Sequence, residues 1–140
     1  MPAEVVEPQA VAARPPATRA ATRDSKAPFT PVTAVDRLEG GAVAVASVVL
    51  FVLAGFDWWW LLALFLVFDL SFAGYALGTR VGAIAYNLVH NYVVPTALVV
   101  LYAVSTALGS DAWPLAFAAG CWFFHVGADR ALGYGPRPSR

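Results

Sequence analysis

Residues 58–77 read WWWLLALFLVFDLSFAGYAL, and Asp69 is the only charged residue among them. A transmembrane helix needs about 20 consecutive, mostly apolar residues to cross a hydrocarbon layer about 30 Å thick. The stretch has that length and composition, and the three tryptophans at its start suit the membrane–water interface. It therefore predicts a membrane-spanning helix and places the chain among membrane proteins.

Three further apolar segments lie on either side of this stretch, at residues 38–56, 81–108 and 112–132. Short polar or glycine-containing breaks separate the four segments, at residues 57, 78–80 and 109–111. Such tight connections make consecutive helices antiparallel neighbours. The third segment is long enough to be tilted, or bent at Pro95. We therefore expect an all-α fold, a four-span transmembrane helical bundle, over residues 34–135.

The composition excludes the common classes of soluble protein. Of the 140 residues, 59% are hydrophobic and 13% are charged, whereas typical soluble domains contain about 25% charged residues. Nine basic and nine acidic residues cancel, so no basic face is available for nucleic-acid phosphates, and we expect no nucleic-acid partner. The lone Cys121 can form neither an internal disulfide nor a cysteine-rich zinc site.

The placement of lysine and arginine predicts the orientation, because cytoplasmic loops carry an excess of both. Residues 1–33 contain prolines and several basic residues, and we expect a disordered cytoplasmic tail. Arg80 and the short basic end at residues 136–140 lie on the same side as this tail if the chain crosses four times. The other two turns contain only Asp57 and Asp111. The pattern predicts a multi-pass protein of the inner (plasma) membrane with both termini in the cytoplasm. It would contact the lipid bilayer, and a homo-oligomer could enlarge it.

Polar residues inside the predicted spans indicate a site. A helix rises 1.5 Å per residue, so Asp69, His90 and His125 lie roughly 12, 14 and 10 Å from the cytoplasmic ends of their helices. Asp129 follows His125 at i+4 on the same helix face. Polar side chains within a membrane are costly and mark functional sites by default. We therefore interpret these four residues as a candidate catalytic cluster that opens toward the cytoplasm.

Further polar residues are expected to surround this cluster. Asn87, His90 and Asn91 share one helical stripe through their i, i+3, i+4 spacing. We therefore expect Asn87 and Asn91 to orient the side chains of the cluster from an outer layer. Glu39 and Arg130 lie nearer to the cytoplasmic rim and complete this layer.

Four interpretations of the cluster remain open at this stage. His90, His125 and Asp69 could hold a divalent metal ion in a membrane-embedded hydrolase that acts on a lipid-like substrate. His90 and His125 could instead be the axial ligands of haem b. The cluster could respond to protons or bind a small solute in a transporter-like protein. It could also only join helices in a structural membrane protein.

Short motifs follow one another along nearly all of the chain after the tail. They are Arg37-Leu38-Glu39-Gly40, Asp69-Leu70-Ser71, Gly74-Tyr75, Arg80-Val81-Gly82-Ala83, Tyr86-Asn87, His90, Tyr92, Pro95, His125-x-Gly127-x-Asp129-Arg130 and Leu132-Gly133-Tyr134-Gly135. In this order they resemble a group of short bacterial integral membrane proteins, domain of unknown function family 4260. The resemblance implies a membrane protein of unassigned activity. Its pattern includes Asp69, Asn87, His90, His125, Asp129 and Arg130, but not Cys121.

Overall fold

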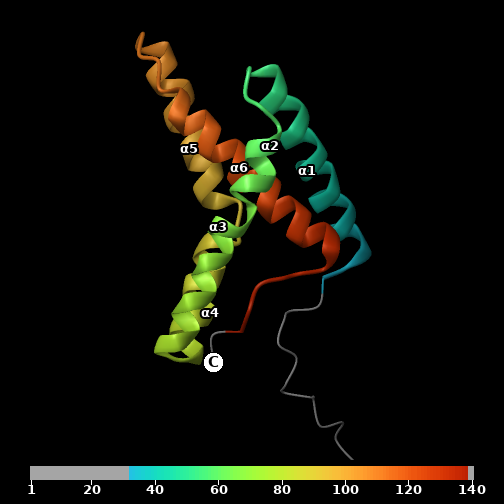
Figure 1. Cartoon of the computed structure of the whole chain (residues 1–140). Coiled ribbons are helices and arrows are strands. Elements are labelled where there is room, and N and C mark those ends of the chain that lie inside the picture. The colour runs from blue at the N-terminus through green and yellow to red at the C-terminus, as the bar shows by residue number, and fades with distance from the viewer. Residues whose placement is uncertain (1–31, 139–140) are drawn as a thin grey trace, which may run out of the picture.

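The computed structural model of the chain describes residues 32–138, and every regular element in this range is a helix (Figure 1). The elements are α1 (Ala34–Leu53), α2 (Trp59–Ala63), α3 (Phe65–Asp69), the 3-10 helix η1 (Leu70–Leu77), α4 (Thr79–Val89), α5 (Val93–Ala107) and α6 (Trp113–Leu132). The all-helical class predicted from the sequence is confirmed. The tail predicted for residues 1–33 lies outside the described residues, apart from its last two.

Helix α1 begins at a capping box. The Thr33 hydroxyl accepts a hydrogen bond from the Asp36 backbone N–H, and the Asp36 carboxylate accepts one from the Thr33 N–H. These bonds satisfy N–H groups that the first turn of a helix leaves unpaired. The Thr33 hydroxyl also donates a hydrogen bond to the Asp36 carboxylate. This bond and the one from the Thr33 N–H favour the charged carboxylate and hold the pKa of Asp36 below its usual range. The start of the bundle is therefore set by the local sequence.

Helices α1 and α6 pack side by side and form the framework of the bundle (Figure 1). A Cβ atom on Gly127 of α6 would lie 2.8 Å from the Gly40 carbonyl oxygen and from the Ala44 nitrogen of α1. The close approach of the two backbones therefore requires glycine at this position. At the end of α6, the Arg37 guanidinium donates a hydrogen bond of 2.7 Å to the Leu132 carbonyl. Helix α5 also packs against α6.

The second predicted span is not one regular helix. Leu64 separates α2 from α3, and the chain then continues as the 3-10 helix η1. Long 3-10 stretches are uncommon and mark strained or functional positions. Asp69 stands at the change from α3 to η1, so the irregular backbone lies beside a residue of the predicted cluster.

Element η1 packs closely against α4. A Cβ atom at Gly82 would overlap the Tyr75 ring, and one at Gly74 would lie 2.9 Å from the Cβ atom of Ala85. Gly78, between the two elements, has a φ of +125°, a conformation that favours glycine. These glycines therefore serve close packing and a tight turn.

The third predicted span is interrupted at residues 90–92, between α4 and α5, in the turn that precedes Pro95. Proline has no N–H to donate to the carbonyl four residues earlier, and its ring collides with that carbonyl. For Pro95 this carbonyl belongs to Asn91, so the helix breaks before the proline. The break leaves His90 just beyond the end of α4.

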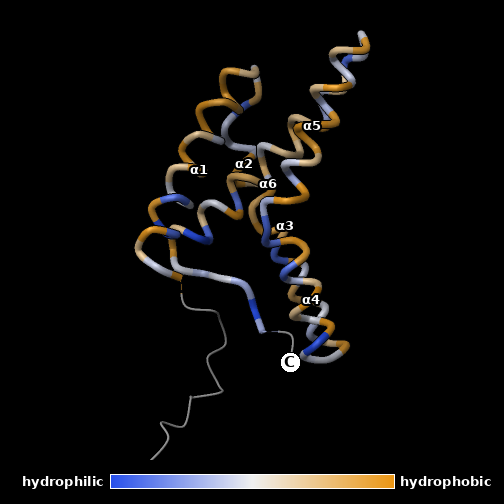
Figure 2. Tube along the Cα trace, turned by 180° about the vertical axis from the view of Figure 1, so that it is seen from behind, coloured by the Kyte–Doolittle hydropathy of each residue, from blue (hydrophilic) through white to orange (hydrophobic). Residues whose placement is uncertain are grey.

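Hydrophobic residues occur along most of the described helices (Figure 2), and many of their side chains are exposed. Leu53, Leu77, Val93 and Leu108 are each at least 75% exposed, whereas few hydrophobic residues are buried. Exposed apolar surface of this extent is unusual for a monomeric soluble protein. The segments Trp59–Leu77 and Thr79–Ala107 are long and apolar enough to cross a membrane.

Aromatic and apolar side chains join one end of α1 to the beginning of α6. The Phe56 ring lies 6.1 Å from the Trp113 ring and 5.3 Å from the Phe117 ring, between centroids. Deeper in the bundle, Cys121 belongs to an apolar cluster with Phe51 and Leu61. Cys121 is therefore a packing residue.

Candidate metal centre

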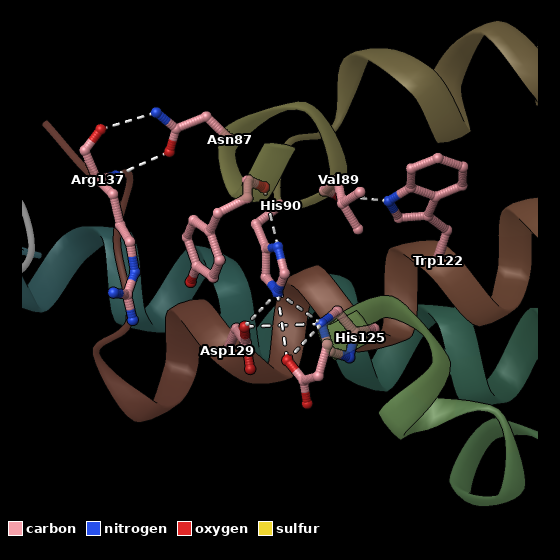
Figure 3. Close-up of polar contacts among 9 residues, drawn as sticks. Asn87, Val89, His90, Trp122, His125, Asp129 and Arg137 are labelled. Atoms are coloured by element: carbon pink, nitrogen blue, oxygen red, sulfur yellow. Dashed lines mark hydrogen bonds and ion pairs between the residues drawn. The ribbon is translucent and has the colours of Figure 1, made fainter. Parts of the chain in front are cut away.

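Four titratable side chains from three segments meet inside the bundle. Asp69 ends α3, His90 follows α4, and His125 and Asp129 lie one turn apart on α6 (Figure 3). One ligand atom from each residue can be chosen so that all four lie within 4.8 Å of one another. The structure thus brings together the four residues of the predicted cluster. It places Asp129 beside the three predicted metal ligands.

The distances between the ligand atoms suit a single metal ion. The Nε2 atom of His90 lies 3.5 Å from Oδ1 of Asp69 and 3.4 Å from Oδ2 of Asp129. The Nε2 atom of His125 lies 3.8 and 3.7 Å from the same two oxygens, and 3.0 Å from Nε2 of His90. A tetrahedral ion bound at about 2.1 Å requires ligand atoms about 3.4 Å apart. Small side-chain shifts would therefore bring all four atoms onto one ion.

The ring of His90 is fixed from two sides. Its Nδ1 lies 3.0 Å from the Tyr86 carbonyl oxygen, and the Tyr86 side-chain ring stacks on it at 3.8 Å between centroids. A carbonyl oxygen only accepts hydrogen bonds, so Nδ1 carries the proton and donates it. The lone pair of Nε2 then faces the two carboxylates. Histidines that bind a metal commonly donate their other ring N–H to a backbone carbonyl in this way, and this hydrogen bond orients the ring.

The His125 side chain is fully buried, and its Nδ1 forms no hydrogen bond within the described residues. The rings of Phe65 and Phe68 lie 4.5 and 5.1 Å from it, between centroids. Without a cation, the His125 proton therefore belongs on Nε2, where it can be donated to the lone pair of His90 Nε2. A metal ion at this position would require the proton on Nδ1 instead.

The two carboxylates stand on the more open side of the cluster. The Asp129 side chain is 13% exposed and the Asp69 side chain 31% exposed, whereas the His90 side chain is only 3% exposed. Both acids line a cavity of about 300 Å³, together with Tyr86 and Arg137. A molecule in this cavity would meet the cluster on its carboxylate side.

The break between α4 and α5 is held by side chains. The Asn91 side-chain amide donates hydrogen bonds to the carbonyls of Asn87 and Leu88, and its oxygen accepts one from the Val93 N–H. These bonds satisfy backbone groups that the end of α4 and the start of α5 leave unpaired. Asn91 therefore shapes the backbone that carries His90 and makes no hydrogen bond to the four cluster residues within the described range.

Asn87 has another partner. Its side chain exchanges two hydrogen bonds with the Arg137 backbone, accepting one from the N–H at 2.8 Å and donating one to the carbonyl at 2.7 Å (Figure 3). The C-terminal segment is thereby attached to α4. The other two residues of the predicted outer layer do not contact the cluster through hydrogen bonds in the described range. Glu39 is exposed on α1, and Arg130 follows Asp129 on α6.

Three residues at the site were not among the predicted site residues. Tyr86 stacks on His90, Trp122 donates a hydrogen bond to the Val89 carbonyl at the helix break, and Arg137 lines the cavity. Tyr86 belongs to the Tyr86-Asn87 motif of the family resemblance, and this motif could have indicated that Tyr86 lies at the site. Trp122 and Arg137 had no such signal, because their contacts depend on a helix break and on the path of the C-terminal segment.

The geometry leaves no space for haem between the two histidines. Axial ligands on opposite sides of an iron, each bound at about 2.0 Å, would place their nitrogens about 4 Å apart. The two Nε2 atoms are 3.0 Å apart, and the carboxylates of Asp69 and Asp129 occupy the positions beside them. The arrangement of the two histidines and two carboxylates therefore does not fit a haem group.

Comparison with protein families matches residues 33–139 to the family described as Domain of unknown function (DUF4260). The matched range contains all four cluster residues, together with Tyr86, Trp122 and Arg137. No curated protein and no solved structure matches the chain.

Proposed function

We propose that this chain, which belongs to the family of domain of unknown function 4260, is an integral membrane protein with a catalytic divalent-metal site. The ligands are His90, His125, Asp69 and Asp129. The reaction class that we propose is the hydrolysis of a lipid-like substrate.

One observation carries this proposal, namely the convergence of four ligand atoms within 4.8 Å in the interior of the bundle. Two carboxylates at one poorly hydrated site repel each other. Buried charges require partners of opposite sign, because their desolvation is otherwise uncompensated. A divalent cation among two carboxylates and two neutral imidazoles supplies that partner. The arrangement is therefore explained more simply by a metal ion than by helix packing.

The donor set favours a zinc-like ion. Imidazole nitrogens suit zinc, and carboxylate oxygens are also common zinc ligands. When bound, such an ion supplies Lewis-acid polarisation, and it would activate a water molecule as a fifth ligand or in place of one of the two carboxylates. The protein holds the His90 ring through its Nδ1 bond to Tyr86 and keeps His125 away from water. Asp69 is the most exposed ligand, so a substrate would approach the ion from the cavity beside it.

The membrane position is part of the proposal. Two of the four predicted spans meet the length and composition of membrane helices, and exposed hydrophobic side chains continue along α1. On α6 the exposed large hydrophobic side chains are those of its end residues, Trp113 and Leu132. Charged residues lower the hydropathy of these two helices at one end only, at residues 36–39 of α1 and 129–130 of α6. We therefore propose four spans, with these charged ends and both termini on the cytoplasmic side of the plasma membrane.

Metal content tests the proposed site. Full-length protein purified in detergent is loaded with Zn²⁺, desalted and analysed by elemental mass spectrometry. We expect about one ion per chain in the unmodified protein, because one set of four ligands is present. The variants His90→Ala, Asp69→Asn and Asp129→Asn should lose most of it. Asp57→Asn and Asp111→Asn remove the same charge outside the cluster and should retain the ion.

Two results would overturn the metal site. One is the absence of stoichiometric Zn²⁺, Fe²⁺ and Mn²⁺ after loading of folded, unmodified protein. The other is full metal content in Asp69→Asn and Asp129→Asn together with the Asp57→Asn control. Either result would leave the proton- or solute-responsive interpretation, which the line of contacts from the Tyr86 carbonyl through His90 to His125 favours. That interpretation predicts a pH response that survives complete removal of metal by a chelator.

A further inference from the structure

A second cavity lies between the connection of α1 to α2 and the first turns of α6. Its volume is about 410 Å³, within the range of ligand pockets, which are typically apolar with a few placed polar groups. None of the four cluster residues lines it, so it is separate from the proposed metal site. Its lining is dominated by four aromatic rings and one carboxylate, those of Phe56, Trp60, Trp113, Phe117 and Asp57.

The four rings are arranged around Phe117. Three ring planes stand nearly perpendicular to it, with interplanar angles of 85° for Phe56, 79° for Trp60 and 84° for Trp113. Their centroids lie 5.3, 5.8 and 6.2 Å from that of Phe117. Trp59 stacks on one face of the Trp60 ring at 4.0 Å, so the other face remains for a ligand. We call the rings of Phe56, Trp60, Trp113 and Phe117 the aromatic box.

Asp57 gives the cavity a negative charge. Its backbone carbonyl accepts a hydrogen bond of 3.1 Å from the Trp60 N–H, so it lies within one turn of a ring of the aromatic box. Within the described residues, its carboxylate makes no hydrogen bond and no ion pair. No basic residue lines the cavity, and the only basic residue between positions 41 and 128 is Arg80, at the start of α4. The cavity is therefore complementary to a cation.

We propose that this cavity binds a quaternary ammonium group, held by the aromatic box and by Asp57. This inference goes beyond the proposed hydrolysis and does not depend on the metal ion. Ring faces are electron-rich and attract cations, tryptophan most strongly, and aromatic cages are a known means of binding quaternary ammonium groups. A primary ammonium is strongly hydrated and loses more on entering such a site. A free choline-like solute and the head group of a choline lipid share this chemistry.

Isothermal titration of full-length protein in dodecyl maltoside tests the proposal, because this detergent carries neither a charge nor an ammonium group. The probes are choline, its neutral isostere 3,3-dimethylbutan-1-ol and dihexanoyl phosphatidylcholine. We expect choline to bind saturably and the isostere at least about tenfold more weakly, because the isostere has the same shape without the charge. Tighter binding of phosphatidylcholine than of choline would identify a lipid head group, and equal binding would identify the ammonium group alone.

Single substitutions separate the contributions of the rings and of the carboxylate. Trp60→Leu and Trp113→Leu should each weaken choline binding by about 2- to 30-fold, because each removes one ring. Asp57→Asn should weaken it by about fivefold at low salt, as expected for an exposed charge about 4 Å from the cation. Trp58→Leu and Asp111→Asn are the matched controls, because they replace the same residue types outside the cavity lining and should leave choline binding unchanged.

Three results would overturn the proposal. They are no saturable binding of choline by folded protein up to about 10 mM, equal binding of the neutral isostere, and unchanged binding in both Trp60→Leu and Trp113→Leu. The isostere and Asp57→Asn leave the packing of the rings intact, so the comparison remains decisive even if a tryptophan variant does not fold. Thermal unfolding identifies such a variant.

Two variants separate this site from the metal centre. Asp69→Asn should lose metal and retain choline binding, whereas Asp57→Asn should lose affinity for choline and retain metal. A chain that binds choline but no metal would refute the proposed function and support this inference. Loss of choline binding in Asp69→Asn that is as large as in Trp113→Leu would contradict the separation of the two sites.

Discussion

At the scale of single residues, the two histidines have unequal surroundings. His90 donates its Nδ1 proton to the Tyr86 carbonyl, so its Nε2 can bind an ion without rearrangement. Nδ1 of His125 has no hydrogen-bond partner in the described range, so without a cation its proton belongs on Nε2. Metal binding therefore requires a change of tautomer at His125 only. This asymmetry gives the site a spectroscopic signature.

Nitrogen NMR of ¹⁵N-histidine-labelled protein can detect this change. The chain contains only these two histidines, so the spectrum holds two residues if the purification tag contains none. We expect Zn²⁺ to move the His125 proton from Nε2 to Nδ1, because a ligating nitrogen must be unprotonated. His90 should remain protonated at Nδ1 in both states. A His125 ring that is protonated at Nδ1 before metal addition would contradict this description.

At the scale of elements, the outer ends of the second predicted segment lie close to those of its helices, whereas α1 begins four residues before the predicted 38–56 segment and ends three residues before that segment does. The interruption at Leu64 was not predicted. The second span was predicted at 58–77 and its helical segments cover 59–77, because polar and glycine residues mark the ends in the sequence. The break at residues 90–92 lies in an apolar helical pattern. Only Pro95, one turn later, indicates it. The predicted stripe of Asn87, His90 and Asn91 assumed an unbroken helix, whereas in the structure Asn91 bonds to the backbone at the break and Asn87 to the backbone of Arg137.

The Asn91 side chain should be essential to this break. We expect Asn91→Ala to lower the free energy of unfolding by about 1–3 kcal/mol, because it removes one partly buried and two exposed hydrogen bonds to the backbone at the break. It should also weaken Zn²⁺ binding by about 10- to 100-fold, as loss of groups that orient metal ligands does.

Thermal unfolding in detergent and competitive Zn²⁺ titration measure these two effects of Asn91→Ala. Thr106→Ala is the control, since it removes another side-chain bond to a backbone carbonyl at an exposed position of α5. Equal effects of both variants would refute a specific role for the break.

The contact between α1 and α6 allows a second prediction at this scale. Gly127→Ala should destabilise the bundle by about 1–3 kcal/mol, because the added Cβ would press against the α1 backbone, which cannot move aside as a side chain can. Gly41→Ala is the matched control on the same interface, where the nearest atom, the Cβ of Ala131, would be 3.9 Å away. It should be neutral, or stabilising by up to about 1 kcal/mol through its better helix propensity. Thermal unfolding of both variants in the same detergent tests the pair, and equal stabilities would contradict the close packing.

At the scale of the whole molecule, the family match confirms the resemblance that the sequence motifs indicate. The proposed topology places the tryptophan-rich ends of α2 and α6 on one side and the basic ends on the other. The ring contact between Trp60 of α2 and Phe117 of α6, at 5.8 Å between centroids, joins these tryptophan-rich ends. Tryptophan prefers the membrane–water interface, and basic residues prefer the cytoplasmic side.

Thiol labelling in intact cells tests this topology. Ser110→Cys should react with a membrane-impermeant maleimide in intact cells, whereas Thr79→Cys should react only after permeabilisation, because the two turns lie on opposite sides of a four-span bundle. The native Cys121 is buried and should contribute little background. Labelling of both variants from the same side would contradict four spans with cytoplasmic termini.

Local patterns in the sequence are enough to predict the helical class and the identity of the four polar residues that meet, because hydrophobic periodicity and isolated polar residues are local signals. The tertiary structure alone decided that one atom from each of these residues falls within 4.8 Å of the others. It also decided that Arg137 returns to the cavity wall. Both features depend on helix breaks and on contacts between distant segments. Packing and hydrogen bonds between distant segments stabilise both features, and a local sequence pattern does not predict such contacts.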